Sequence, residues 1–152
     1  MAFMTGNMAG KTDRMIRFED VADLPQVRLV WGRSIRNAFP KHVHRSFSIG
    51  IVERGMRSIV GRDGTVHGRE GDVFVVGPGV SHRCIADDHD YRIVCIEPDY
   101  VRRLLHGSED GRKDVPRFAS FVVTDAALFA RIASFSDMAG RTGCTREKEA
   151  LL

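Results

Sequence analysis

The chain of 152 residues contains only three cysteines, and none of them forms a C-x-x-C pair. Cys84, Cys95 and Cys144 are therefore expected to be free thiols in a reducing compartment. No stretch approaches the ~18 consecutive apolar residues that a membrane-spanning helix requires. The first residues also lack the basic and apolar regions of a secretory signal. These absences predict a cytoplasmic protein without a membrane partner.

A strong excess of charge is also missing. Lysine and arginine number 23 and aspartate and glutamate 20, which gives a formal net charge of +3. Because opposite charges are interspersed and no cluster of five basic residues occurs, a solvated surface is favoured over direct nucleic-acid binding. Gly-x-Ser-x-Gly and His-Glu-x-x-His motifs are absent, so no nucleophile or zinc-protease motif is visible. The length and the 43% hydrophobic content suit one globular domain with a real core.

Between residues 26 and 97 the pattern is that of β-strands. Short apolar or alternating runs recur at near-regular spacing, which predicts an antiparallel sandwich or barrel. The expected strands are Val27–Trp31, Phe47–Val52, Arg57–Val60, Val73–Val76 and Tyr91–Ile96. The turn clusters expected between them are Glu53–Gly55, Gly61–Gly64, Arg69–Asp72 and Gly77–Gly79. The acidic run Asp87–Asp90 is interpreted as a solvated loop.

The chain after Glu97 changes to a helical pattern. Pro98 suits a first helical position, Thr124 or Asp125 can cap a second helix, and a last helix is expected from Thr145. In the second helix one apolar face is formed by Leu128, Ile132 and Phe135. That face can pack on the chain's own barrel or form a dimer seam, and the spacing alone does not decide between them.

Three histidines carry the clearest chemical signal. His42 and His44 are two residues apart, so on an extended strand their side chains project to the same side, together with Ser48 farther along. His82 follows the Gly77–Gly79 turn at the end of an apolar run. An antiparallel barrel can bring the two segments together, so three imidazoles are expected to converge in one cavity. Convergent imidazoles suit a divalent metal or a polar ligand.

The segment from Phe39 to Ile96 resembles a cupin, a small β-barrel with two short motifs. His42 and His44 match the histidines of the first motif, and His82 matches that of the second. Gly55 matches the glycine that closes the first motif, and Gly71-Asp72 the turn that opens the second. The carboxylate of the cupin ligand set is missing, because Ser48 and Ile49 occupy its place.

A finer resemblance is to the N-terminal sensor domain of AraC-type transcription regulators. It rests on the pattern Phe39-Pro40-x-His42-x-His44-x3-Ser48-x-Gly50-x-Val52-x-x-Gly55 and on the Tyr91–Tyr100 passage, and it covers roughly residues 25–152. The resemblance implies a cupin-like antiparallel β-barrel (a double-stranded β-helix or jelly roll) followed by two or three C-terminal helices. It further implies a small polar effector inside the barrel and a homodimer. DNA would be bound only through a helix-turn-helix domain beyond Leu152, where the natural polypeptide is expected to continue.

The resulting assignments divide the chain into a lead-in over residues 1–24, a barrel over 25–123 and dimerisation helices over 124–152. The expected ligand-binding residues are His42, His44, Ser48, His82, Trp31 and Phe39. The expected ligands of a possible Zn, Ni, Fe or Mn ion are His42, His44 and His82. The expected dimer residues are Leu128, Ile132 and Phe135. The alternative is a stand-alone metal-dependent cupin enzyme, an oxygenase or isomerase, that uses the three histidines.

Overall fold

The computed structural model describes residues 15–107, 114–139, 141 and 145–152. Cys144 and most of the lead-in expected over residues 1–24 lie outside this part of the chain. The strands are β1 Met15–Asp20, β2 Val27–Ile35, β3 Phe39–His42, β4 Phe47–Gly61, β5 Gly64–Arg69, β6 Val73–Val76, β7 His82–Ile96 and β8 Val122–Val123. The helices are α1 Pro98–His106, α2 Ala126–Met138 and α3 Thr145–Leu151.

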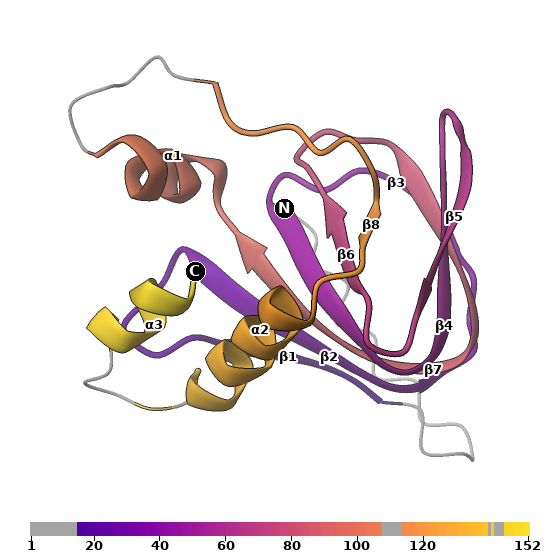
Figure 1. Cartoon of the computed structure of the whole chain (residues 1–152), viewed down its shortest axis with the longest axis horizontal. Coiled ribbons are helices and arrows are strands. Elements are labelled where there is room, and N and C mark those ends of the chain that lie inside the picture. Colours follow the sequence, from indigo (N-terminus) through magenta and orange to yellow (C-terminus); the bar gives the residue numbers. More distant parts are fainter. Residues whose placement is uncertain (1–14, 108–113, 140, 142–144) are drawn as a thin grey trace.

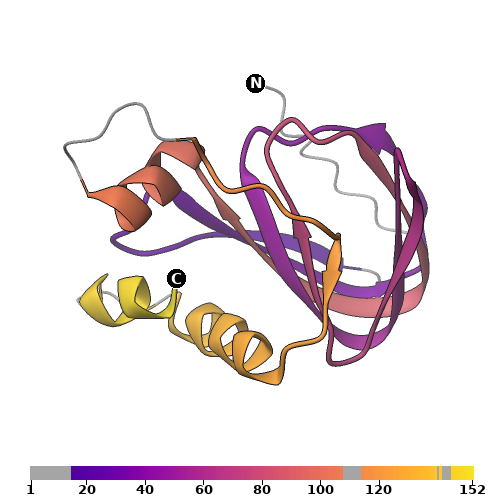
Figure 2. The same ribbon diagram turned by 45° about the horizontal axis from the view of Figure 1, so that its top comes forward.

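The strands form one antiparallel sheet in the order β1-β2-β7-β4-β6-β8, with β3 added to β7 and β5 added to β4. The sheet curls on itself, and the three helices gather on one side of it (Figures 1 and 2). This is the cupin-type double-stranded β-helix expected from the sequence, with the C-terminal helices in place. None of the described helices has the length and apolar composition needed to cross a membrane.

The two longest strands, β4 and β7, run through segments that the sequence analysis assigned to a turn and a loop. Glu53–Gly55 is not a turn between strands. It is an irregular, bulged stretch within β4, where the register to β7 shifts twice. Gly55 has φ +76°, and a Cβ there would lie 2.4 Å from the carbonyl oxygen of Asp88, so only glycine fits this bend. The acidic run Asp87–Asp90 is likewise part of β7.

These irregularities change which residues face the barrel interior. Before the bulge, Ser48 and Val52 occupy even-numbered inward positions on β4. After it, Arg57 and Ile59 pair with Ala86 and Cys84 and are buried at odd-numbered positions. Because side chains alternate along a strand, one extra residue reverses the direction of everything that follows.

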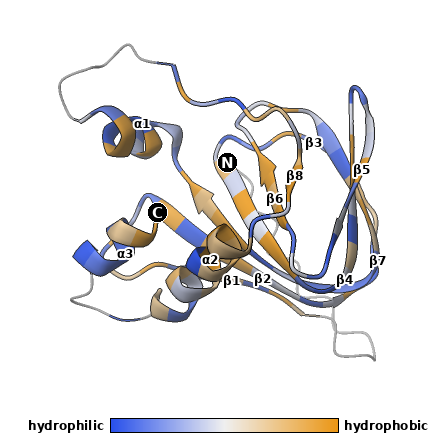
Figure 3. Cartoon of the chain, viewed as in Figure 1, coloured by the Kyte–Doolittle hydropathy of each residue, from blue (hydrophilic) through white to orange (hydrophobic). Residues whose placement is uncertain are grey.

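The sheet separates two apolar clusters. The outer cluster joins Leu29, Ile51 and Val94 to α2 residues such as Phe135, and the inner cluster contains Val52, Phe74 and Tyr91 inside the barrel. All four residues of β6 are buried, and Figure 3 shows this strand as apolar along its length. The barrel thus has a packed outer wall, which keeps its interior separate from the helices.

The helices begin where their sequence signals predict. Pro98 occupies the first turn of α1, and the Asp125 carboxylate caps α2 by accepting a hydrogen bond from the Leu128 backbone N–H at 2.9 Å. On α3, the fully buried Lys148 ammonium donates to the carbonyl oxygens of Ala22 (2.8 Å), Ala139 (3.3 Å) and Arg141. The last helix is thereby fastened to the β1–β2 connection and to the end of α2.

The apolar face of α2 packs on its own barrel. Ile132 and Phe135 belong to the outer cluster and are buried, and Leu128 packs against it partly buried. Packing within the chain, one of the two uses left open for this face, therefore occupies it. Ile132 and Phe135 are not available as surface residues for a dimer partner.

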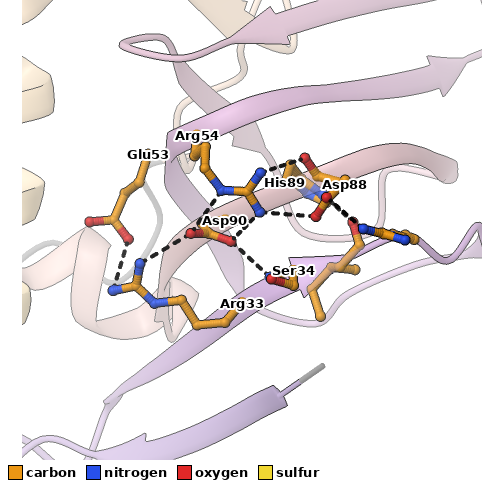
Figure 4. A network of polar contacts seen from close by, with 9 residues as sticks. Arg33, Ser34, Glu53, Arg54, Asp88, His89 and Asp90 are labelled. Carbon is orange, nitrogen blue, oxygen red and sulfur yellow. Dashed lines mark hydrogen bonds and ion pairs between the residues drawn. The ribbon is translucent and has the colours of Figure 1, made fainter. Parts of the chain in front are cut away.

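One end of the barrel is held by a network of ion pairs, shown in Figure 4. Asp90 of β7 accepts hydrogen bonds from the Ser34 backbone N–H at 2.7 Å and from Arg54 and Arg33 at 3.0 and 3.3 Å. Arg54 also pairs with Asp88 at 2.9 Å. Burial acts to raise the pKa of Asp90, but hydrogen bonds from Arg54, Ser34 and Arg33 lower it to about 2. The carboxylate therefore links β2, β4 and β7.

Replacing Asp90 with asparagine should lower the free energy of unfolding by about 1.5–3 kcal/mol, the usual value for hydrogen bonds to a charged group. The lowered pKa means that the carboxylate stabilises the fold above its ordinary pKa of 3.8, and that this contribution disappears as the pH falls toward 2. Urea unfolding at pH 7 measures the effect. Asp63→Asn, in the exposed β4–β5 turn, is the matched control and should change stability by less than about 0.5 kcal/mol.

Candidate functional site

The three histidines are brought together by the pairing of β3 with the beginning of β7. Phe39 lies opposite Cys84 and His42 opposite His82, although the two strands are about 40 residues apart in sequence. His44 follows β3 by two residues, and its backbone carbonyl accepts a hydrogen bond from Gly79 N–H at 2.8 Å. The Gly77–Gly79 turn is thus fixed beside the His42–His44 segment, and it positions His82.

The three imidazole rings meet as the sequence predicted. The ring centroids of His42 and His82 are 4.4 Å apart, those of His42 and His44 4.7 Å, and those of His44 and His82 5.1 Å. One ligand nitrogen from each ring lies within 4.8 Å of the other two. The Nε2 atoms of His42 and His44 are 3.2 Å apart. This spacing allows a single small atom or group to contact all three rings.

Backbone carbonyls fix the proton on two of the rings. His42 Nδ1 donates to Pro40 O at 2.6 Å, and His82 Nδ1 donates to Val80 O at 2.9 Å. A proton held on Nδ1 leaves the Nε2 lone pair free in the neutral ring. Such second contacts are the usual way in which proteins orient histidine ligands.

The environment of the cluster lowers the pKa values of two of its histidines. Burial, followed by the charges of His42, His82 and Arg57, lowers the pKa of His44 to about 4. Burial is also the main reason that the pKa of His82 is lowered, since its hydrogen bond to Val80 acts in the opposite direction. Neutral imidazole is the form that binds metals and accepts hydrogen bonds.

The donor set fits a divalent transition metal with open coordination positions. Three neutral imidazole nitrogens suit Zn, Ni or Fe, and Mn less well, because Mn prefers carboxylate and water ligands. No carboxylate belongs to the cluster among the described residues, in keeping with Ser48 and Ile49 at the place of the cupin carboxylate. His42, His44 and His82 would hold the ion, which would supply Lewis-acid binding of a ligand atom.

A cavity of about 470 Å³ opens beside the histidines, between β1 and the inward faces of β2, β4 and β7. Its volume lies within the range typical of small-molecule sites. Its apolar wall includes Ile16, Phe18, Val30, Phe39 and Ile93. Its polar groups include His42, His44, Ser46, Ser48, Arg57 and the Tyr91 side chain. Ser48 and Phe39 therefore line the cavity, whereas His82 completes the cluster behind it with 2% of its surface exposed.

Trp31 was predicted to be a ligand-binding residue, but the structure places it outside the cavity. Its neighbour Val30 lines the cavity, so alternation along β2 places Trp31 on the opposite face of the sheet. There the indole packs on the outer cluster, with the guanidinium groups of Arg17 and Arg92 at 5.1 and 4.6 Å from the ring centroid. Trp31 therefore contributes to sheet packing and is not among the residues that line the cavity.

Three residues in or beside the cavity were not predicted from the sequence: Arg57, Tyr91 and His89. His89 is fully buried, where it donates from Nδ1 to Ile35 O at 3.0 Å and accepts from Arg57 at 3.4 Å. Arg57 stands first in an expected strand, but the β4 bulge turns it inward against the simple alternation. The sequence did contain one signal of this inward position: Arg57 starts an apolar strand and lies two residues after Gly55, a glycine that can mark a bulge.

A second hollow of about 730 Å³ lies between the β4–β5 hairpin, the turn at 77–81 and residues 115–121. Among the described residues that line it there is no histidine or cysteine. Its polar groups are turn and loop side chains such as Arg62, Asp63 and Arg117. The histidines therefore converge at the cavity inside the barrel and not at this second hollow.

One curated protein is similar in sequence to part of this chain. It is the uncharacterized HTH-type transcriptional regulator YbfI of Bacillus subtilis strain 168, 27% identical over 103 residues. The match covers 66% of this chain and 37% of that relative. The chain therefore spans little more than a third of the relative's length.

Solved cupin structures are similar to this chain as well. A cupin-2 domain protein from Shewanella frigidimarina is 20% identical and has a TM-score of 0.45, covering 53% of this chain and 79% of that one. An RmlC-like cupin protein from Methanocaldococcus jannaschii is 15% identical, with a TM-score of 0.47, 59% of this chain and 87% of that one covered.

The family model described as AraC-like ligand binding domain matches residues 24–152, which include strands β2 to β8, the three histidines and all three helices. The chain therefore belongs to the family of AraC-like ligand-binding domains.

Proposed function

We propose that this chain is the effector-sensing and dimerising domain of a cytoplasmic AraC-type transcription regulator, whose DNA contacts are made by a separate helix-turn-helix domain. The observation that carries the proposal is the cavity inside the barrel, where His42, His44 and Ser48 meet an apolar wall. A cavity with few convergent polar groups on apolar walls is the usual form of a small-molecule site. The effector binds there, and no chemical step is needed.

The strand β7 offers a route from the cavity to the helices. Tyr91 and Ile93 line the cavity, while Arg92 between them points to the outer face. There Arg92 pairs with Glu53 at 2.6 Å and with Asp137 of α2 at 2.8 Å. A ligand that favours one position of β7 therefore also favours one position of α2, which is how binding energy shifts a conformational equilibrium.

Dimerisation, in this proposal, uses surfaces other than the buried face of α2. Ile132 and Phe135 are already packed within the chain, so a partner subunit would contact the outward sides of the helices. Sedimentation equilibrium at tens of micromolar tests the dimer, and a monomer at that concentration contradicts it.

The effector site itself is tested by screening small polar molecules for a rise in melting temperature, followed by titration calorimetry. His44→Gln should weaken binding of a hit by 10- to 100-fold, because the half-buried ring faces the cavity. His106→Gln, at the exposed end of α1, is the control and should leave affinity within twofold. If wild type and His44→Gln bound the hit with equal affinity, that result would contradict a role of the histidines in binding.

The alternative function is a metal-dependent cupin enzyme, and the specific observation in its favour is that His42, His44 and His82 each place a ligand nitrogen within 4.8 Å of the other two. Metal analysis separates the two functions. A stoichiometric metal together with turnover of a substrate supports the enzyme. A protein that binds its effector and leaves it chemically unchanged supports the sensor.

A further inference from the structure

Arg57 places a positive charge inside the barrel. Its side chain is only 8% exposed, although it lines the cavity. The guanidinium lies between two aromatic rings, with its central carbon 4.7 Å from the centroids of both Phe74 and Tyr91. It donates to Cys84 Sγ at 3.2 Å and to His89 Nε2 at 3.4 Å. Aromatic faces and neutral acceptors stabilise this cation without neutralising it.

No acidic side chain among the described residues forms an ion pair with Arg57. Three acidic residues of β4 and β7, Glu53, Asp88 and Asp90, pair with other arginines at the barrel end, as Figure 4 shows. Asp87 of β7 is exposed to solvent. Two further carboxylates stand on the cavity wall. Asp20 is largely exposed and pairs with Arg28 at 2.8 Å, and Glu97 is exposed.

The buried Nε atom of Arg57 has no hydrogen-bond partner. A buried charge is costly unless it is paired, and a buried N–H without an acceptor adds to that cost. An imidazole side chain is either neutral or positive, so the three neighbouring histidines contribute no negative charge. The interior is therefore positive, with a donor that lacks an acceptor, and it is preorganised for an anion.

We infer that the cavity binds a small organic monocarboxylate, whose carboxylate pairs with Arg57 and whose apolar body lies against Ile16, Phe18, Phe39 and Ile93. This inference rests on the proposed function, in which the barrel interior is the effector site. It narrows the effector from a polar molecule to an acid. The planar guanidinium fork matches a carboxylate in geometry and charge.

The walls favour a carboxylate over a phosphate. A phosphate group carries up to two charges and three strongly accepting oxygens. Two guanidinium groups line the cavity, but that of Arg28 already pairs with Asp20, which leaves Arg57 to bind the anion. Its described apolar residues also form a continuous wall, from Phe18 on β1 across Val30 on β2 to Ile93 on β7. A ligand with one anionic end and an apolar body satisfies both parts of the cavity.

Matched acid and amide pairs test the inference directly. Benzoate is compared with benzamide and hexanoate with hexanamide, with inorganic phosphate as a third arm, by titration calorimetry at pH 7.5. The protein is treated with a chelator beforehand, so that no acid can bind through a metal. At least one acid should bind at least tenfold more tightly than its amide and more tightly than phosphate. Equal affinity of acids and amides, stronger binding of phosphate, or no binding of either acid at 10 mM overturns the inference.

Variants of Arg57 locate the anion. Arg57→Met should abolish the preference for the acid over its amide. Arg57→Lys keeps the charge in a different geometry, so it should bind the acid more weakly than wild type but still more tightly than the amide. Arg62→Met, exposed in the β4–β5 turn, removes an equal charge outside the cavity and should have no effect. Circular dichroism establishes that each variant is folded. If Arg57→Met does not fold, Arg57→Lys decides, and wild-type affinity in that variant contradicts the role of Arg57.

The proposed function can survive a failure of this inference. A sugar or another neutral molecule could bind in the cavity, perturb the His44 resonances and show no dependence on Arg57. That result would contradict only the inference that the effector is a carboxylic acid. Failure of the whole panel, neutral and acidic, would count against the effector site as well.

Discussion

Acidification from pH 6.5 to pH 4 should destabilise the fold, and replacing His89 with glutamine should remove part of that loss. His89 is fully buried. Burial, opposed by the hydrogen bond to Ile35 and assisted by the charge of Arg57, lowers its pKa from 6.5 to about 4. Between these values the unfolded chain binds a proton that the folded chain does not, so stability decreases as the pH falls.

The size of this effect follows from the two pKa values. Lowering the pKa of one group from 6.5 to about 4 corresponds to roughly 3 kcal/mol. His44 and His82 also have lowered pKa values and act in the same direction. The carboxylates Asp88 and Asp90, whose pKa values are lowered from 3.8, affect stability mainly below this window. His89→Gln should therefore make the pH dependence shallower without abolishing it.

Urea unfolding at pH 7, 6, 5 and 4 measures the slope for wild type and His89→Gln. Slopes rather than absolute stabilities are compared, because the substitution also changes the contact to Arg57. His106→Gln removes an exposed histidine and should reproduce the wild-type slope. Parallel curves for wild type and His89→Gln would show that His89 is not kept neutral by burial.

Gly50→Ala should cost about 3 kcal/mol of stability and disturb the cavity at the same time. Gly50 lies on the inner face of β4, opposite Phe74 of β6. A Cβ there would lie 2.2 Å from Phe74 Cζ and 2.7 Å from the backbone oxygen of Arg92. Because backbone cannot move aside cheaply and Phe74 is buried, the added methyl group overpacks the barrel.

The second consequence reaches Arg57. The Phe74 ring is one of the two faces that hold the guanidinium, so a displaced ring also displaces the cation. Gly68→Ala is the matched control, since its nearest neighbours would lie at 3.5 and 3.6 Å. Thermal or urea unfolding should show a large loss for Gly50→Ala and a change within about 1 kcal/mol for Gly68→Ala. Wild-type stability of Gly50→Ala would contradict the tight packing of the interior.

The barrel, its helices and the histidine cluster could be predicted from sequence because they depend on local patterns. The two-residue spacing of His42 and His44 fixes a common face, and the Gly-Pro-Gly turn before His82 marks the end of a strand. The start of α2 could be predicted because Asp125 is a cap that acts within one helical turn. The meeting of the two distant segments followed from an antiparallel barrel, and the cupin resemblance pointed to the same three histidines.

Other features depend on tertiary structure, which alternation does not reveal. The bulge around Gly55 reverses the inward positions of β4, so Arg57 enters the barrel where the pattern of Ser48 and Val52 would leave it outside. Trp31 was assigned to the cavity because it is aromatic, but its position beside Val30 puts it on the outer wall. The apolar spacing of α2 around Ile132 is the same whether this face packs on the chain's own sheet or on another subunit.

The central claim is that the effector binds inside the barrel, between Arg57 and the three histidines. Isotope-labelled histidine and arginine side chains, followed by NMR during titration with any ligand that raises the melting temperature, test it most directly. The account predicts saturable shifts of His44 and Arg57 at the same ligand concentration, with His106 unchanged. A ligand that saturates the hollow at residues 115–121 and leaves the barrel histidines unmoved would contradict it.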